Sequence, residues 1–150
     1  MKDIPTLDRL KQLAEAHRET QARQLALLVT RRDEAKQKLK LLEDYLRDYQ
    51  RRLTDATRSG INGEGLRNYR QFMTQLERAI EQQSGMTDLA ERSVAEAQRE
   101  WASHQRRVDS FQTLTDRRAS AKAVVDTRRA QKQQDEVAAR RTPRRLDDDS

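Results

Sequence analysis

The chain has 150 residues, a formal net charge of +6 at pH 7, and a composition that is 37% charged and 34% hydrophobic. With one Trp, three Tyr and two Phe, it has too few large apolar residues for a thick globular core. The absence of cysteine excludes disulfides and thiolate metal sites. No apolar run approaches the roughly 20 residues that cross a bilayer, and no signal-peptide segment is present, so we expect a soluble, cytoplasmic protein.

The first predicted helix spans about residues 4–58. Asp3 and Pro5 suit its first turn, because Asp caps helices and Pro is tolerated at their start. From Leu7 to Ala56, apolar residues recur at alternating spacings of three and four. This spacing is typical of the a and d positions of a coiled-coil heptad, labelled a to g, whose apolar stripe packs against another helix.

The predicted turn covers residues 59–65. Three glycines, Gly60, Gly63 and Gly65, lie within six positions, and such clusters favour a chain reversal. Asn62 is a candidate N-cap for the helix that follows, because a short amide side chain can accept a hydrogen bond from the first helical turn.

The second predicted helix spans about residues 66–139 and carries a similar stripe from Leu66 to Phe111. If the chain reverses near Ile61, the numbers of facing residues sum to about 122, so Leu46 meets Leu76. The sequence therefore predicts an all-α fold in which residues 1–150 form one domain, a long antiparallel two-helix coiled-coil hairpin. Self-association of two chains through the same stripes is the alternative.

Two details of this stripe can be predicted. Arg32 faces the small Ala90, which leaves room for the apolar stem of the arginine to lie along the seam. His17, Gln21 and Leu25 follow one another at steps of four. Two consecutive steps of four predict a stutter, which locally unwinds a supercoil.

The two edges of the seam differ in chemistry when Leu42 and Leu76 are placed at d. The e edge is polar and comprises Lys36, Glu43, Gln50, Arg70, Glu77, Ser84 and Glu91. The g edge comprises Lys38, Tyr45, Arg52, Phe72, Ala79 and Met86. In an antiparallel pair both g edges lie on one side, so Tyr45 and Phe72 are expected to share a face near the turn. Grouped exposed aromatics favour a docking site, and the alternative is that they only widen the seam.

The second helix is predicted to be unpaired beyond about residue 118, because the first helix begins near residue 4. Residues 117–146 hold ten Lys or Arg and three Asp or Glu. We expect this basic segment to be either disordered alone or a helix that binds an acidic surface. Pro143 ends any helix, and residues 140–150 are predicted to form a disordered tail.

Few residues could support catalysis. His17 and His104 are expected to share a layer of the seam, but no carboxylate or thiolate beside them completes a metal site, so we expect polar packing. The glycine-rich turn lacks the Gly-Lys-Ser/Thr ending of a phosphate loop. We therefore expect a non-enzyme with no cofactor, metal or small-molecule substrate. Nucleic-acid binding is disfavoured because the basic segment has no aromatic side chain to stack on bases.

Residues 42–49 read Leu-Glu-Asp-Tyr-Leu-Arg-Asp-Tyr, and residues 69–82 begin Tyr-Arg-Gln-Phe-Met. Both segments resemble the FliJ family of flagellar export proteins, and the likeness runs from about Leu7 to Val137. Two positions depart from the family pattern, which favours Gln where this chain has Lys38 and His where it has Gln83.

The resemblance implies a component of the bacterial flagellar type III export apparatus, with a coiled coil similar to that of the rotary ATPase γ subunit. The implied partners are the export ATPase hexamer, the cytoplasmic domain of the export gate's membrane protein, and export chaperones. The implied location is cytoplasmic and peripheral to the inner membrane at the flagellar base. Alternatives are the equivalent stalk of a virulence-type secretion system, a basic scaffold, and a nucleic-acid-binding protein.

The resemblance also implies two sets of contact residues. The gate-binding residues are Leu42, Tyr45, Tyr49, Phe72, Leu76 and Ala79. The likeness to an ATPase stalk implies contacts with the ATPase ring at Leu7, Leu10, Leu13, Arg117, Arg118 and Lys122.

Overall fold

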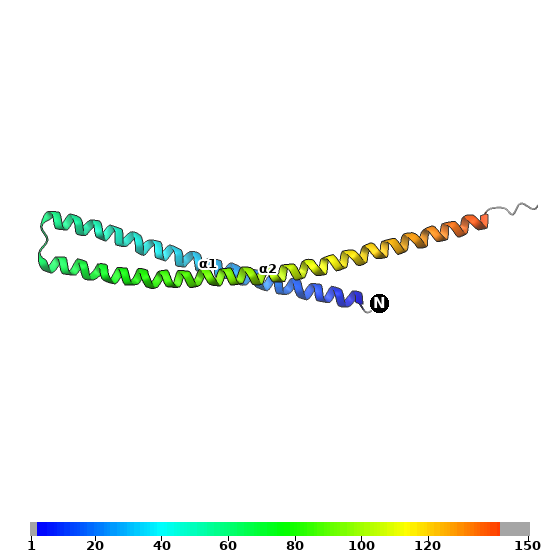
Figure 1. Cartoon of the computed structure of the whole chain (residues 1–150), viewed down its shortest axis with the longest axis horizontal. Helices are drawn as coiled ribbons and strands as arrows, with labels where there is room; N and C mark the ends of the chain where they lie inside the picture. The colour runs from blue at the N-terminus through cyan, green and yellow to red at the C-terminus, as the bar shows by residue number, and fades with distance from the viewer. Residues whose placement is uncertain (1–2, 142–150) are drawn as a thin grey trace, which may run out of the picture. The chain divides into compact units, whose positions relative to one another are not determined.

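The computed structural model describes residues 3–141, with side-chain surroundings from residue 6 onward. Two helices, α1 (Asp3–Ser59) and α2 (Gly63–Arg141), account for almost all of these residues, and no strand occurs among them. The helices run antiparallel on either side of a short turn, so the fold is an all-α helical hairpin, as predicted (Figure 1).

The chain divides into two compact units, and both helices contribute to each. The first, which we call the hairpin unit, comprises Ala14–Gln105 and contains the turn. The second, which we call the terminal unit, combines the start of α1 up to Leu13 with α2 from Arg106 onward. The prediction of a single domain stays a prediction.

The turn between the helices contains three residues, Gly60 to Asn62, rather than the seven predicted. Gly60 has a φ of 87°, a conformation that residues with a Cβ rarely adopt, and its N–H donates to the Thr57 carbonyl at 3.3 Å. The Asn62 side-chain oxygen accepts from the Gly65 N–H at 2.7 Å, which confirms the predicted cap. This cap allows α2 to begin at Gly63 instead of about residue 66, because it satisfies a donor of the first turn.

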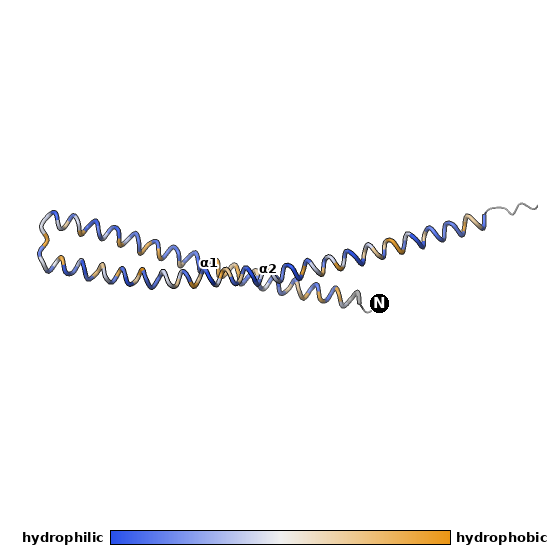
Figure 2. The backbone as a smooth tube through the Cα atoms, viewed as in Figure 1, coloured by the Kyte–Doolittle hydropathy of each residue, from blue (hydrophilic) through white to orange (hydrophobic). Residues whose placement is uncertain are grey.

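The core of the hairpin unit follows the predicted stripe on α2. The side chains buried there are Leu76, Gln83, Thr87, Val94 and Ala97, together with Ala14 of α1. In Figure 2, hydrophobic and hydrophilic segments alternate along both helices, as an amphipathic coiled coil requires. The Thr87 hydroxyl lies 3.3 Å from the Ala35 carbonyl, a pair whose numbers sum to the predicted 122. The two stripes therefore pair within one chain.

The predicted stutter in α1 is wrong. Ala14 is buried and Arg18, Gln21 and Leu25 are half-buried, whereas His17 is exposed. The stripe therefore continues in alternating steps of four and three through Arg18. An arginine can occupy a seam position because its stem packs while its guanidinium reaches outward, here to the Glu19 carboxylate at 3.2 Å. Arg32 behaves in the same way and bonds Asp33 at 3.0 Å.

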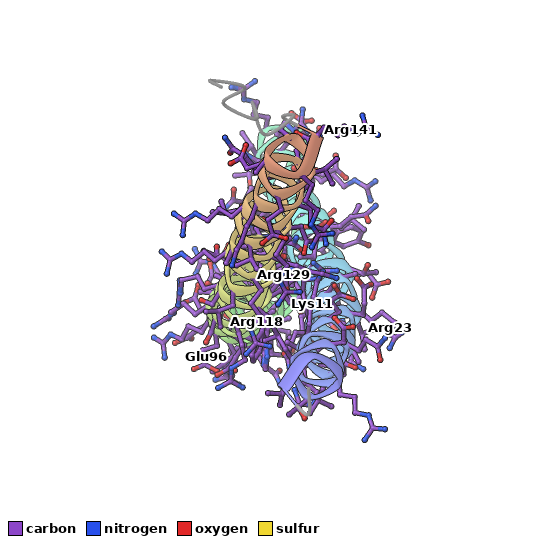
Figure 3. The ribbon with its side chains drawn as sticks, turned by 90° about the vertical axis from the view of Figure 1, so that its right-hand side faces the viewer. Lys11, Arg23, Glu96, Arg118, Arg129 and Arg141 are labelled. Carbon is purple, nitrogen blue, oxygen red and sulfur yellow. The ribbon has the colours of Figure 1, made fainter. Side chains whose placement is uncertain are left out.

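The terminal unit has a thinner core. Val108 is buried and Leu7 and Phe111 are half-buried, but Leu10 and Leu13 are exposed. Every residue of α2 from Asp116 to Arg141 is exposed. Figure 3 shows the side chains of this stretch standing out around the ribbon, with Arg118, Arg129 and Arg141 labelled.

Two further predictions concern the helix end and membranes. Arg140 and Arg141 belong to α2, which contradicts the predicted start of a disordered tail at residue 140; the basic last turn complements the helix dipole. The rest of that predicted tail, residues 142–150, lies outside the described part of the chain. Neither helix, over the residues described, carries a stretch long and apolar enough to span a bilayer.

Candidate docking surface

Aromatic side chains from both helices meet near the turn of the hairpin unit. The ring centroids of Tyr49 and Phe72 lie 4.5 Å apart, and those of Tyr45 and Phe72 lie 6.2 Å apart. Tyr49 also contacts Tyr69, at 5.0 Å. These distances fall in the range of favourable aromatic contacts, so the four rings form one connected cluster across the seam.

The cluster follows from where the heptad places each ring. Tyr49 and Tyr69 occupy d positions and fill the seam, whereas Tyr45 and Phe72 occupy g positions beside it. Phe72 is half-buried, but Tyr45 keeps 53% of its surface exposed. The prediction that Tyr45 and Phe72 share one face is confirmed. We call the exposed side formed by Tyr45, Tyr49 and Phe72 the aromatic surface.

The other predicted gate-binding residues are less exposed than Tyr45. Leu42 and Ala79 are half-buried, and Leu76 is only 8% exposed. Leu76 therefore contributes to the seam and offers little area to a partner. The aromatic surface therefore consists of two half-buried rings, Tyr49 and Phe72, and one exposed ring, Tyr45, that a partner could contact.

The opposite side of the hairpin unit is polar. Lys36 of α1 and Glu91 of α2 form an ion pair at 2.9 Å, and both occupy e positions. This contact confirms that the e edges of the two helices share a side, as the g edges do through Tyr45 and Phe72. The apolar and polar edges therefore face in different directions.

The two positions that depart from the family pattern have different surroundings. Lys38 is exposed on the g edge. Gln83 belongs to the predicted stripe of α2, and it is buried in the seam, where its Nε2 donates to the Ala35 carbonyl at 3.1 Å. A glutamine at a d position points inward, where it shares that carbonyl with Thr87. Of these two positions, only Lys38 is therefore exposed beside the aromatic surface, where it could contact a partner directly.

Sequence reasoning missed Tyr69 and Leu41. Tyr69 is not among the predicted gate-binding residues, although its ring completes the cluster through Tyr49. Leu41 is exposed at a c position and precedes Tyr45 by four residues, so the two side chains are neighbours on α1. A scan of the c positions, which flank g, would have revealed it.

His17 and His104 also meet across the helices. Their rings are 5.7 Å apart in an edge-to-face arrangement, which confirms that they share a layer, although His17 lies beside the seam rather than in it. Among residues 3–141, no group of three or more His, Asp or Glu side chains is placed to hold a metal ion.

The residues that the stalk likeness assigned to the ATPase ring all lie in the terminal unit. Leu7 is half-buried, and the other five, Leu10, Leu13, Arg117, Arg118 and Lys122, are exposed. This unit therefore presents apolar and basic side chains together, but their contact with an ATPase stays a prediction.

Comparison with known proteins gives consistent results over almost the whole chain. The sequence model of a family described as "Flagellar FliJ protein" matches residues 1–147. A Flagellar FliJ protein of Salmonella typhi is 34% identical over 139 residues, which cover 93% of this chain and 95% of that protein. A Flagellar FliJ protein of Escherichia coli (strain K12) is 32% identical over 145 residues, covering 97% and 99% of the two chains.

Proposed function

The chain belongs to the FliJ family and so has a role in flagellar export, and we propose that it acts there as a stalk-like coupling protein. In this role one part of the hairpin contacts the export gate and another part contacts the export ATPase ring. Export chaperones are the third class of proposed partner. The single observation that carries the proposal is the aromatic surface, a cluster of aromatic side chains with the exposed Tyr45 ring on a helical hairpin of this family.

The aromatic surface is the proposed contact with the cytoplasmic domain of the gate's membrane protein. Tyr45 supplies an exposed ring, while Tyr49 and Phe72 hold the layer below it in place. A rigid aromatic side chain makes a large contact at small cost in conformational entropy, which is why tyrosine is common among residues that dominate binding energy. Lys38, on the same edge, would add a positive charge to the rim.

The terminal unit is the proposed contact with the ATPase ring. Residues 116–141 of α2 are exposed throughout, and Arg117, Arg118 and Lys122 lie at the start of that stretch. Helical packing in water normally requires a covered face, so an exposed helix of this length suits a protein that is completed by its partner. The exposed Leu10 and Leu13 of α1 add apolar area in the same unit.

A reconstitution with the purified export ATPase tests the stalk role. We expect the full-length chain to promote hexamer formation and to raise ATP turnover when present at one copy per hexamer or fewer. A chain with Leu10→Gln, Leu13→Gln and Arg117→Gln should do so less well while keeping its helical circular dichroism. If turnover and assembly are the same with and without the wild-type chain, the stalk role is wrong and a scaffold role replaces it.

A further inference from the structure

The exposed large apolar side chains of the hairpin unit all lie on one side. Five of them, exposed by between 47% and 62%, are Leu27, Leu41, Tyr45, Met86 and Leu89. Continuing the heptad from Leu42 and Leu76 places every one at a c or g position. The c positions flank the g positions around a helix, so these five residues lie on the same side of the hairpin unit. The polar e edges, joined by Lys36 and Glu91, lie on the other side.

Three of these residues lie away from the aromatic surface. The Tyr45–Phe72 contact sets the register of the two g edges. Two heptads further from the turn on each helix, the same register brings Arg31 opposite Met86. Leu27 precedes Arg31 by four residues and Leu89 follows Met86 by three, so both lie at this level, one on each helix. We call Leu27, Arg31, Met86 and Leu89 the leucine–methionine surface.

The channel between the helices continues beyond this surface. Beyond Leu89, the lining of an open hollow of about 500 Å³ includes the seam residues Leu28 and Ala97. The rest of its lining is polar or charged and comprises Gln21, Gln24, Ser93, Glu96, Arg99 and Glu100. Apolar atoms of the seam are therefore reachable from this side.

The charged side chains of α1 at the level of this surface are two cations with one carboxylate between them, a formal balance of +1. Arg31 and Lys38 are exposed g-edge cations, about 10 Å apart along α1. Within residues 3–141 neither forms an ion pair within 4.0 Å, and Glu34, which lies between them at a c position, forms none either. The comparable e-edge cation, Lys36, is paired with Glu91. Cations beside exposed leucine and methionine complement a ligand that is both apolar and acidic.

We propose that the leucine–methionine surface docks an acidic amphipathic helix of a partner protein. The helix would lie along the g edges with apolar residues spaced at i, i+3 or i+4, and i+7 facing Met86 and Leu89. Carboxylates seven residues apart on its flank would meet Arg31 and Lys38. Methionine suits this role because its flexible thioether adapts to different apolar surfaces. The surface goes beyond the proposed gate contact, since none of its four residues belongs to the aromatic surface.

Fluorescence anisotropy with the full-length chain tests this proposal. The probe is a labelled 18-residue amphipathic helical peptide with a leucine stripe and glutamate flanks, and its comparison peptide carries lysine in place of every glutamate. We expect the glutamate peptide to bind at least about tenfold more tightly than the lysine peptide, and to bind more weakly as salt is raised. Equal binding of the two peptides, or binding of neither, would overturn the proposal.

Substitutions test whether the peptide binds at the leucine–methionine surface. Met86→Gln with Leu89→Gln should weaken binding of the glutamate peptide about tenfold, and Leu27→Gln should weaken it from the other helix. The matched control is Val124→Gln with Val125→Gln, which alters two similarly exposed apolar residues of the terminal unit and should have no effect. All these side chains are exposed, so helical circular dichroism should not change. Equal loss in the control would show non-specific adhesion and overturn the assignment.

Two further measurements distinguish this proposal from the gate contact and from binding of a second copy of the chain. Tyr45→Ala should leave peptide binding within about twofold of wild type, so failure of the gate contact and failure of this proposal are distinguishable. Sedimentation equilibrium of the unliganded chain should show a monomer. A dimer that dissociates on Met86→Gln with Leu89→Gln would show that a second copy covers the surface, and would overturn the assignment to a separate partner.

Discussion

Tyr45 and Phe72 meet across the two helices with ring centroids 6.2 Å apart, yet Tyr45 remains more than half exposed. The two rings differ in what lies beneath them. The Phe72 ring also packs on Tyr49, a seam residue, with centroids 4.5 Å apart. The Tyr45 ring has its aromatic contact with Phe72. One member of the pair therefore contributes mainly to folding, and the other is free to contribute to binding.

This difference predicts unequal effects on stability. Tyr45→Ala should lower the free energy of unfolding by about 1 kcal/mol, the value of one aromatic contact at an exposed site. Phe72→Ala should cost about 2 kcal/mol, because it also removes the contact with Tyr49 and part of the seam. Urea unfolding followed by circular dichroism measures both. Equal losses would show that the Tyr45 ring is also part of the core.

The Asn62 cap should account for part of the stability of the turn. Asn62→Ala removes the oxygen that accepts from the Gly65 N–H, and should cost about 1 kcal/mol. Asn62→Asp keeps an acceptor and should stay within a few tenths of a kcal/mol of wild type. Thermal unfolding of the three proteins checks this. An alanine variant as stable as wild type would mean that solvent satisfies the donor equally well.

Gln83 should stabilise one register rather than the fold as a whole. Gln83→Leu removes a buried amide that donates to the Ala35 carbonyl, and should raise the free energy of unfolding by about 1 kcal/mol. A uniformly apolar seam specifies pairing less well, so the variant should self-associate at high concentration where wild type does not. Sedimentation equilibrium detects this, with Gln71→Leu, the same change at an exposed f position away from the seam and both edges, as the control. A strictly monomeric Gln83→Leu protein would remove the register role.

Truncation after Arg118 should separate the hairpin from the ATPase contact. The described residues removed, 119–141, are all exposed, so their loss should leave the unfolding midpoint in urea unchanged. The proposed ATPase contact should weaken, because the basic exposed helix is gone. Co-sedimentation with the export ATPase measures this. Full binding by the truncated chain would exclude residues beyond 118 from that contact.

Much of the fold was predictable because one physical pattern controls it. Alternating steps of three and four predicted both helices, their antiparallel pairing and the register that joins Ala35 to Thr87. The meeting of Tyr45 and Phe72 followed from g positions that share a side in an antiparallel pair. These features depend on the order of apolar and polar residues, which a sequence displays directly.

The features that sequence reasoning missed depend on how single side chains behave. Apolarity alone favoured His17 over Arg18 as a seam residue, but a long arginine stem packs there while its charge reaches out to Glu19. Glycines at 63 and 65 suggested a longer turn, yet the cap from Asn62 is sufficient to start the helix. Leu41, Met86 and Leu89 form one side with Tyr45 only when c and g positions are considered together.

The most direct test of the proposed role is a calorimetric titration of the full-length chain with the purified cytoplasmic domain of the export gate. Three proteins are compared: wild type, Tyr45→Ala on the aromatic surface, and Lys36→Ala on the polar e edge. We predict that wild type and Lys36→Ala bind alike, and that Tyr45→Ala binds at least about tenfold more weakly. Equal affinity of all three proteins would contradict the proposed gate contact.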